Sequence, residues 1–250
     1  MGKNKYDNQE FFDKYIKMTR SVYGLKGAGE WQEFKRMLPS LEGKKVLDLG
    51  CGFGWHCKYA IENNAKEVVG IDSSEKMLKQ AKKINGDSSI EYVKDTIEDI
   101  KFKEDYFDVV ISSLAFHYVE NFKEVCKKVY DCLVYGGDFV FSVEHPIFTA
   151  YGSQEWYVDE LGNRLHWPVD NYFNEGKRKS IFLGEEVVKY HKTITMYINT
   201  LIHCGFEIKE VTEPKPPKEM LEGNKEMQDE LRRPMMLLIS ARKKEIVDMW

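Results

Sequence analysis

The sequence predicts a doubly wound α/β fold, in which a mostly parallel sheet is covered by crossover helices on both faces. From Lys45 onward, short β-branched runs alternate with amphipathic segments of helix length, which is the rhythm of such a fold. The first of these runs ends in the glycine-rich turn "GCGFG" at 50–54. Because open α/β sheets bind ligands beyond the carboxyl ends of their strands, this turn is the expected ligand site.

The elements follow one another in a regular order after residue 44. Serines suited to an N-cap begin the second helix, with Glu75 in its first turn, while Asn121 begins the third helix and a glycine pair ends it. A further helix and two strands complete the pattern. The expected strands cover 45–50, 66–72, 90–95, 107–113, 137–145, 206–214 and 235–244, and the expected helices cover 55–64, 73–84, 121–137 and 185–205.

A chain of 250 residues suits one domain with added segments. The first 40 residues are amphipathic and predict a helical cap, and residues 41–145 form the expected core. Residues 146–184 carry many aromatic side chains and are too long for an idle loop, so a lid or substrate-binding insertion is expected there. Residues 185–250 supply the last helix and strands, interrupted by a proline-bearing, charged excursion that we expect to be exposed.

Composition excludes several classes of protein. The net charge of -4 provides no general attraction for nucleic acid or anionic membrane. No run approaches 18 apolar residues, and the N-terminus lacks the apolar core of a signal peptide, so we expect a cytoplasmic protein. The 5 cysteines are odd in number and form no C-x-x-C pair, and no histidine pair has metal-ligand spacing, so neither a disulfide framework nor a metal site is predicted.

The glycine turn departs from the dinucleotide fingerprint. G-x-G-x-x-G would place its third glycine at position 55, which is Trp55, whereas the spacing here is D-x-G-x-G-x-G from Asp48 to Gly54. Asp72 follows Gly50 by 72 − 50 = 22 residues and ends the second strand, where a carboxylate can accept both hydroxyls of a ribose. Carboxylates suit a ligand that carries a sulfonium and an amino group. A nicotinamide-dependent reductase stays open as an alternative.

Four motifs in order resemble those of class I S-adenosylmethionine-dependent methyltransferases, in particular the small-molecule branch called type 11. They read "VLDLGCGFGWH", "VVGIDSSEKML", "VKDTIEDI" and "FDVVISSLAFHYVEN". The resemblance implies S-adenosylmethionine as the cofactor and S-adenosylhomocysteine as its product. It also implies a Rossmann-like sheet of seven strands in the order 3-2-1-4-5-7-6, with strand 7 antiparallel.

The resemblance implies roles for individual residues. The glycine turn would hold the methionine end of the cofactor, and Asp72 the ribose hydroxyls. The segments after the second, third and fourth strands would border the ribose, the adenine and the reacting methyl, and the N-terminal helices with Tyr6, Phe11, Phe12 and Tyr15 would cover the site. The implied cofactor-binding residues are Asp48, Gly50, Cys51, Gly52, Gly54, Asp72, Ser73, Met77, Asp95, Thr96, Ile97, Ser112, Ser113 and Leu114.

The acceptor is less determined. His145 after the fifth strand and His117 after the fourth are candidate general bases, although a hydrogen-bonded structural role is the alternative for each. The segment "SSLAFHY" has no N/D-P-P-Y motif and the chain has no Pro-Cys pair, which argues against DNA bases as acceptors. We expect a flat or apolar small molecule. A methyltransferase acting on tRNA or protein, or a non-catalytic cofactor-binding module, stays open, as does the oligomeric state.

Overall fold

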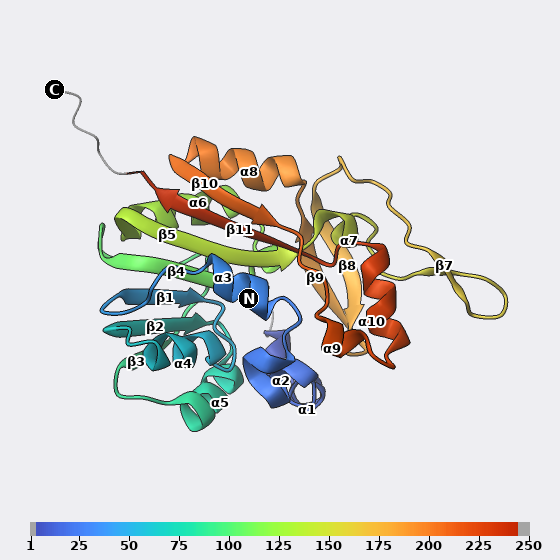
Figure 1. The fold of residues 1–250 in the computed structure, drawn as a ribbon, viewed down its shortest axis with the longest axis horizontal. Coiled ribbons are helices and arrows are strands. Elements are labelled where there is room, and N and C mark those ends of the chain that lie inside the picture. Colours follow the sequence, from blue (N-terminus) through green and yellow to red (C-terminus); the bar gives the residue numbers. More distant parts are fainter. Residues whose placement is uncertain (1–3, 245–250) are drawn as a thin grey trace.

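A seven-stranded sheet forms the centre of the molecule (Figure 1) in the computed structural model, which describes residues 4–244. Its order is β10-β11-β5-β4-β1-β2-β3, and β11 runs antiparallel to both of its neighbours. The order expected from the resemblance is therefore confirmed. The strands are β1 (Lys45–Leu49), β2 (Glu67–Asp72), β3 (Ile90–Lys94), β4 (Phe107–Ser113), β5 (Leu133–Glu144), β10 (Phe206–Thr212) and β11 (Met236–Lys243).

Helices cover both faces of this sheet. On one face α3 (Trp31–Met37), α4 (Trp55–Glu62) and α5 (Glu75–Asn85) share an apolar core with alternate residues of the strands. On the other face α6 (Phe122–Cys132) and α8 (Ile194–His203) pack against the remaining strand residues. The crossovers change face between β1 and β4, and this topological switch point is where the glycine turn lies.

The N-terminal segment lies at the carboxyl ends of β1, β2 and β4 (Figure 1). Asp7 fixes it to the start of α5, because its Oδ1 accepts hydrogen bonds from Ser74 Oγ at 2.7 Å and from the Lys76 N–H at 3.1 Å. The segment therefore covers the edge where a ligand is expected. Its elements are η1 (Lys5–Asp7), α1 (Gln9–Tyr15), α2 (Thr19–Tyr23) and η2 (Gly24–Gly27).

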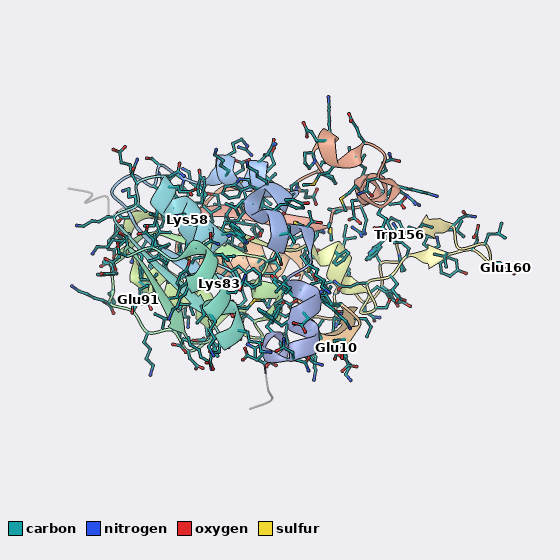
Figure 2. The ribbon with its side chains drawn as sticks, turned by 90° about the horizontal axis from the view of Figure 1, so that it is seen from below. Glu10, Lys58, Lys83, Glu91, Trp156 and Glu160 are labelled. Carbon is teal, nitrogen blue, oxygen red and sulfur yellow. The ribbon has the colours of Figure 1, made fainter. Side chains whose placement is uncertain are left out.

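The segment after β5 forms two small two-stranded sheets. The hairpin of β6 and β7 projects from the body of the molecule (Figure 1), with Trp156 at its base and Glu160 at its tip (Figure 2). Arg233, in the segment between β10 and β11, anchors this hairpin. Its guanidinium lies 4.0 Å from the ring centroid of Trp167, and the residue is only 7% exposed. The elements are α7 (Pro146–Ala150), β6 (Tyr157–Val158), β7 (Arg164–His166), β8 (Gly176–Phe182), β9 (Glu185–His191), α9 (Lys218–Leu221), α10 (Lys225–Asp229) and η4 (Glu230–Arg232).

Two expected boundaries are wrong. The predicted helix over 185–205 is helical only from Ile194, because Glu185–His191 forms strand β9, which pairs with β8 and buries alternate residues. Thr193 then caps α8, its hydroxyl accepting from the Met196 N–H at 3.0 Å. Strand β5 also begins at Leu133 rather than 137, so α6 ends before the glycine pair.

Two features are absent from residues 4–244. None of the helices there is long and apolar enough to cross a bilayer. In the same residues, no group of three or more His, Cys, Asp and Glu side chains is arranged to hold a metal ion.

Candidate active site

The glycine turn brings backbone close to its neighbours at the switch point. Gly50 has φ +77°, and a Cβ on it would lie 2.5 Å from the Cβ of Ala115, so only glycine fits. Gly52 has φ +54° with no heavy atom within 4 Å of where its Cβ would stand, so its backbone faces open space. The turn therefore presents bare backbone to a ligand.

Asp72 shapes this turn from the end of β2. Its Oδ2 accepts from the Gly52 N–H at 3.0 Å, and its Oδ1 accepts from the Ser74 N–H at 2.8 Å. Burial raises the pKa of Asp72 to about 6, although these two backbone donors lower it. The carboxylate is thus fixed between two turns, with further lone pairs available for hydroxyl donors.

A cavity of about 60 Å³ lies between the turn and the N-terminal segment, lined by residues including Tyr15, Arg20 and Ser113. Gly24 closes one side: it has φ +60°, and a Cβ there would come within 2.7 Å of the Trp55 ring. The N-terminal segment consequently sits in direct contact with the first residue of α4.

Arg20 places a cation at this cavity. Its Nη2 forms an ion pair with the buried Glu30, and its Nη1 donates to Ser113 Oγ at 3.4 Å. Ser113 ends β4, so the guanidinium reaches from the N-terminal segment to the strand end that is expected to border the reacting methyl. No spacing in the sequence identified Arg20 or Glu30, because an amphipathic segment does not reveal which of its polar side chains turn inward.

Three buried polar atoms without hydrogen-bond partners belong to a residue that lines the cavity, to the ion-pair partner of Arg20, and to the strand end that leads into the glycine turn. They are Trp55 Nε1, Glu30 Oε2 and Asp48 Oδ1, out of six such atoms found in the described part of the chain. Asp48 lies beneath the turn, its Oδ2 accepts from Cys57 Sγ at 3.3 Å, and burial raises its pKa to about 7. Unpaired buried polar atoms are costly, and a donor beside two acceptors fits a ligand with a carboxylate and an ammonium group.

The remaining predicted cofactor residues divide into two groups. Asp95, Thr96 and Ile97 lie next to the turn: the Asp95 N–H donates to the Asp72 carbonyl at 3.3 Å, and Ile97 Cδ1 would be 3.5 Å from a Cβ on Gly50. Ser73 Oγ accepts from Asn4 Nδ2 at 2.8 Å. Ser112, Met77 and Cys51 are buried: the Ser112 hydroxyl donates to the Leu49 carbonyl at 2.8 Å, Met77 is 2% exposed within α5, and Cys51 is 6% exposed. Gly54 lies against Tyr92, whose hydroxyl would be 2.1 Å from a Cβ there.

Leu114 adopts an unusual backbone conformation directly after β4. Its φ of +53° is in the left-handed region, which a branched side chain rarely occupies. Its N–H donates to the Ser142 carbonyl at 2.9 Å, so the neighbouring strand β5 holds the strained residue in place. Strain of this kind gathers at functional sites.

Both candidate histidine bases have the Nδ1 lone pair occupied by a backbone donor. His145 Nδ1 accepts from the Ile147 N–H at 3.1 Å, and His117 Nδ1 accepts from the Glu144 N–H at 3.4 Å. The neutral rings therefore carry their proton on Nε2. In His145 this nitrogen lies 2.8 Å from Glu213 Oε1. Burial lowers the pKa of both rings, that of His117 to about 4. This geometry weighs against the predicted base role of either histidine.

A buried polar network joins β5 to the inserted strands. Lys189 on β9 is 3% exposed, and its Nζ lies 2.6 Å from Glu144 Oε1 and 2.8 Å from Gln154 Oε1. Gln154 Nε2 donates to the other Glu144 oxygen at 2.8 Å. The end of β5 is thereby fixed to the segment expected to contact the acceptor. The mistaken helix over 185–205 hid Lys189, because its inward orientation follows from the strand.

Comparison with known proteins identifies the family. A profile of a methyltransferase domain matches residues 47–141. The chain is 59% identical to a Listeria monocytogenes protein assigned to the S-adenosylmethionine-dependent methyltransferases, with a TM-score of 0.84 over 89% of this chain and 100% of that one. It is 44% identical to an S-adenosylmethionine-dependent methyltransferase from Mesorhizobium loti, with a TM-score of 0.81 over 88% of this chain and 100% of that one.

A more distant likeness covers part of the chain. It is 31% identical over 167 residues to the tRNA U34 carboxymethyltransferase of Cellvibrio japonicus, which is 58% of this chain and 52% of that enzyme. The fold, the two close relatives and the donors and acceptors around the glycine turn agree on S-adenosylmethionine as the cofactor. The chain belongs to the class I S-adenosylmethionine-dependent methyltransferases.

Proposed function

We propose that this enzyme methylates a small-molecule acceptor by in-line displacement, with the methyl donor held between the glycine turn and the N-terminal segment. The observation that carries the proposal is the cavity between the glycine turn and the N-terminal segment, lined by Arg20 and by Trp55, whose buried indole N–H has no hydrogen-bond partner. Bound S-adenosylmethionine supplies a methyl group already activated by a sulfonium. The chain's own task is then to align donor and acceptor, and alignment contributes roughly 7–11 kcal/mol.

We assign the ends of the donor by charge. The Arg20 guanidinium and the Trp55 indole N–H would bind the carboxylate of the methionine moiety. The unpaired oxygens of Asp48 and Glu30 would accept from its ammonium group. Asp72 would accept the ribose hydroxyls, as the sequence predicts.

The proposal assigns no histidine base, because the Nδ1 lone pairs of His117 and His145 are engaged. A base is dispensable where the acceptor can lose its proton to water before attack. Residues 146–184, anchored through Gln154 and Lys189, are proposed to enclose part of the acceptor. A cytoplasmic location stays a prediction.

Calorimetric titration of the purified protein with S-adenosylhomocysteine tests the donor site, with NAD as the control ligand. Micromolar binding of S-adenosylhomocysteine alone is the expected result, and Arg20→Leu should weaken it by roughly tenfold because a charge-assisted pair is lost. Binding of NAD in its place would contradict the proposed site and its orientation.

A tRNA acceptor is the second candidate, favoured by the partial likeness to the Cellvibrio japonicus enzyme. It predicts binding to tRNA that falls steeply with salt, since phosphate contacts release counterions. Filter binding of unfractionated tRNA at 50 and 200 mM salt separates the two candidates. The net charge of -4 favours the small molecule.

A further inference from the structure

One aromatic side chain of the N-terminal segment lies in the wall of the cofactor cavity. Tyr15, the last residue of α1, lines that cavity together with Gly50 and Gly52 of the glycine turn. Its ring packs edge-on against Phe53 of the same turn and against Tyr6 of η1, with centroids 5.6 and 5.4 Å apart. The ring is therefore held between the turn and η1.

The Tyr15 side chain brings an aromatic surface but no charge to the cavity. Burial raises the pKa of its phenol, so the group stays protonated at physiological pH. Its hydroxyl makes no hydrogen bond to another of the residues 4–244. Because a buried tyrosine hydroxyl usually finds a partner, neither charge nor hydrogen bonding explains why this ring stands here.

The lining of the cavity includes groups assigned to both ends of the methyl donor. Arg20, assigned to the methionine carboxylate, forms one part of it. Gly52 forms another, and its N–H donates at 3.0 Å to Asp72, which is assigned to the ribose hydroxyls. Ser113, at the strand end expected to border the reacting methyl, also lines it. In S-adenosylmethionine the sulfur joins the methionine chain to the ribose, so the sulfur is the part of the ligand that would lie beside Tyr15.

We propose that the Tyr15 ring recognises the positive charge on that sulfur and so favours binding of the methyl donor over the product; this inference rests on the proposed donor site. The face of an aromatic ring is electron-rich and attracts a cation, most strongly where water is excluded. S-adenosylmethionine carries a positive charge on sulfur and S-adenosylhomocysteine does not, whereas their two ends are the same. Tyr15 would thereby limit inhibition of the enzyme by its own product.

Calorimetric titration at pH 7.5 with three ligands tests this inference. S-adenosylmethionine, S-adenosylhomocysteine and sinefungin share their adenosine and amino-acid ends, and sinefungin carries a protonated amine in place of the sulfonium. The wild type should bind the two cations more tightly than S-adenosylhomocysteine, and Tyr15→Leu should reduce that preference by roughly fivefold. The readout is the ratio of the Kd values, so a loss of packing that weakens all three ligands equally leaves it unchanged.

Two further changes at position 15 separate the electrons of the ring from its shape. Tyr15→Phe keeps the electron-rich face and should retain the preference. Pentafluorophenylalanine incorporated at position 15 keeps the ring shape but reverses the charge distribution of its face, so the preference should be lost even if Tyr15→Leu folds poorly. Tyr23→Leu is the matched control in the same segment, because Tyr23 is 67% exposed on α2, and it should retain the preference.

The outcomes separate this inference from the proposed function. If none of the three ligands binds the wild type, the proposed donor site falls. If all three bind but the wild type shows no preference for the cations, or the preference survives the fluorinated ring, then the inference is overturned while the donor site stands. Loss of the preference in Tyr15→Phe would also overturn it, because the hydroxyl rather than the ring would then be responsible.

Discussion

At the scale of single residues, the proposed donor site includes a buried carboxylate with a raised pKa. Burial raises the pKa of Asp48 to about 7, while the group would ionise near 4 in an unfolded chain. Between those values the folded state retains a proton that the unfolded state has lost. The free energy of unfolding therefore falls as the pH rises from about 4 to about 7 through this residue.

Affinity for S-adenosylhomocysteine should change in the opposite direction. If the ionised forms of Asp48 and Asp72 bind the ligand, the association constant should rise about twentyfold from pH 6 to pH 8: about tenfold from Asp48, whose ionised fraction grows from about 0.1 to about 0.9, and about twofold from Asp72. Asp48→Asn should leave only about a twofold rise, from Asp72 with its pKa of about 6. Calorimetry at the two pH values measures the association constant of the wild type and of the variant. If the variant shows the same rise with pH as the wild type, Asp48 is excluded as the cause of that rise.

Lys189 gives a second residue-scale prediction. Lys189→Ala leaves the Glu144 carboxylate buried without its cation and should lower the free energy of unfolding by about 3–5 kcal/mol. The double variant Lys189→Met/Glu144→Leu should recover most of that loss, because neither charge remains to be desolvated. Urea denaturation of the two variants is the measurement, and equal loss in both would mean that packing rather than charge is responsible.

At the scale of elements, we expect the contact between η2 and α4 to hold the N-terminal segment over the turn. Gly24→Ala introduces a Cβ 2.7 Å from the Trp55 ring at φ +60°, which should displace the segment and weaken S-adenosylhomocysteine binding by about tenfold. Gly43→Ala is the matched control: its φ is +71° but no atom lies within 4 Å. It should cost about 1 kcal/mol of stability and leave affinity unchanged. Similar affinities in both variants would contradict closure by this contact.

The sequence predicts the elements of the nucleotide-binding core better than those that follow it. β1, β2 and β4 carry apolar runs and end in recognisable turns, and β3 alternates apolar and polar residues, so local patterning is sufficient to predict them. The segment 185–191 fails that test: its buried residues alternate and include Lys189 and His191, so only tertiary pairing with β8 decides that it is a strand. Arg20 escapes prediction for the same reason, since its partners lie in η2–α3 and β4.

At the scale of the whole molecule, ligand binding should raise thermal stability. At a concentration of S-adenosylhomocysteine about 100 times its dissociation constant, linkage adds about 2.7 kcal/mol, or roughly 5–10 °C in Tm for a chain of this size. NAD at the same concentration should leave Tm unchanged, and Asp72→Ala should largely abolish the shift. Scanning calorimetry measures these changes in Tm. A rise in Tm that persists in Asp72→Ala would mean that the ligand does not bind at the end of β2.

The position of β11 has a consequence for how the molecule assembles. β11 fits between β5 and β10, yet it follows the end of β5 by 236 − 144 = 92 residues. Until it inserts, β5 presents an unpaired row of N–H and C=O groups flanked by the buried side chains of Phe139 and Phe141. Such an edge is a template for pairing with another chain. Completion of the sheet is therefore a late, non-local event, and the time before it is when this protein is most exposed to aggregation and most dependent on chaperones.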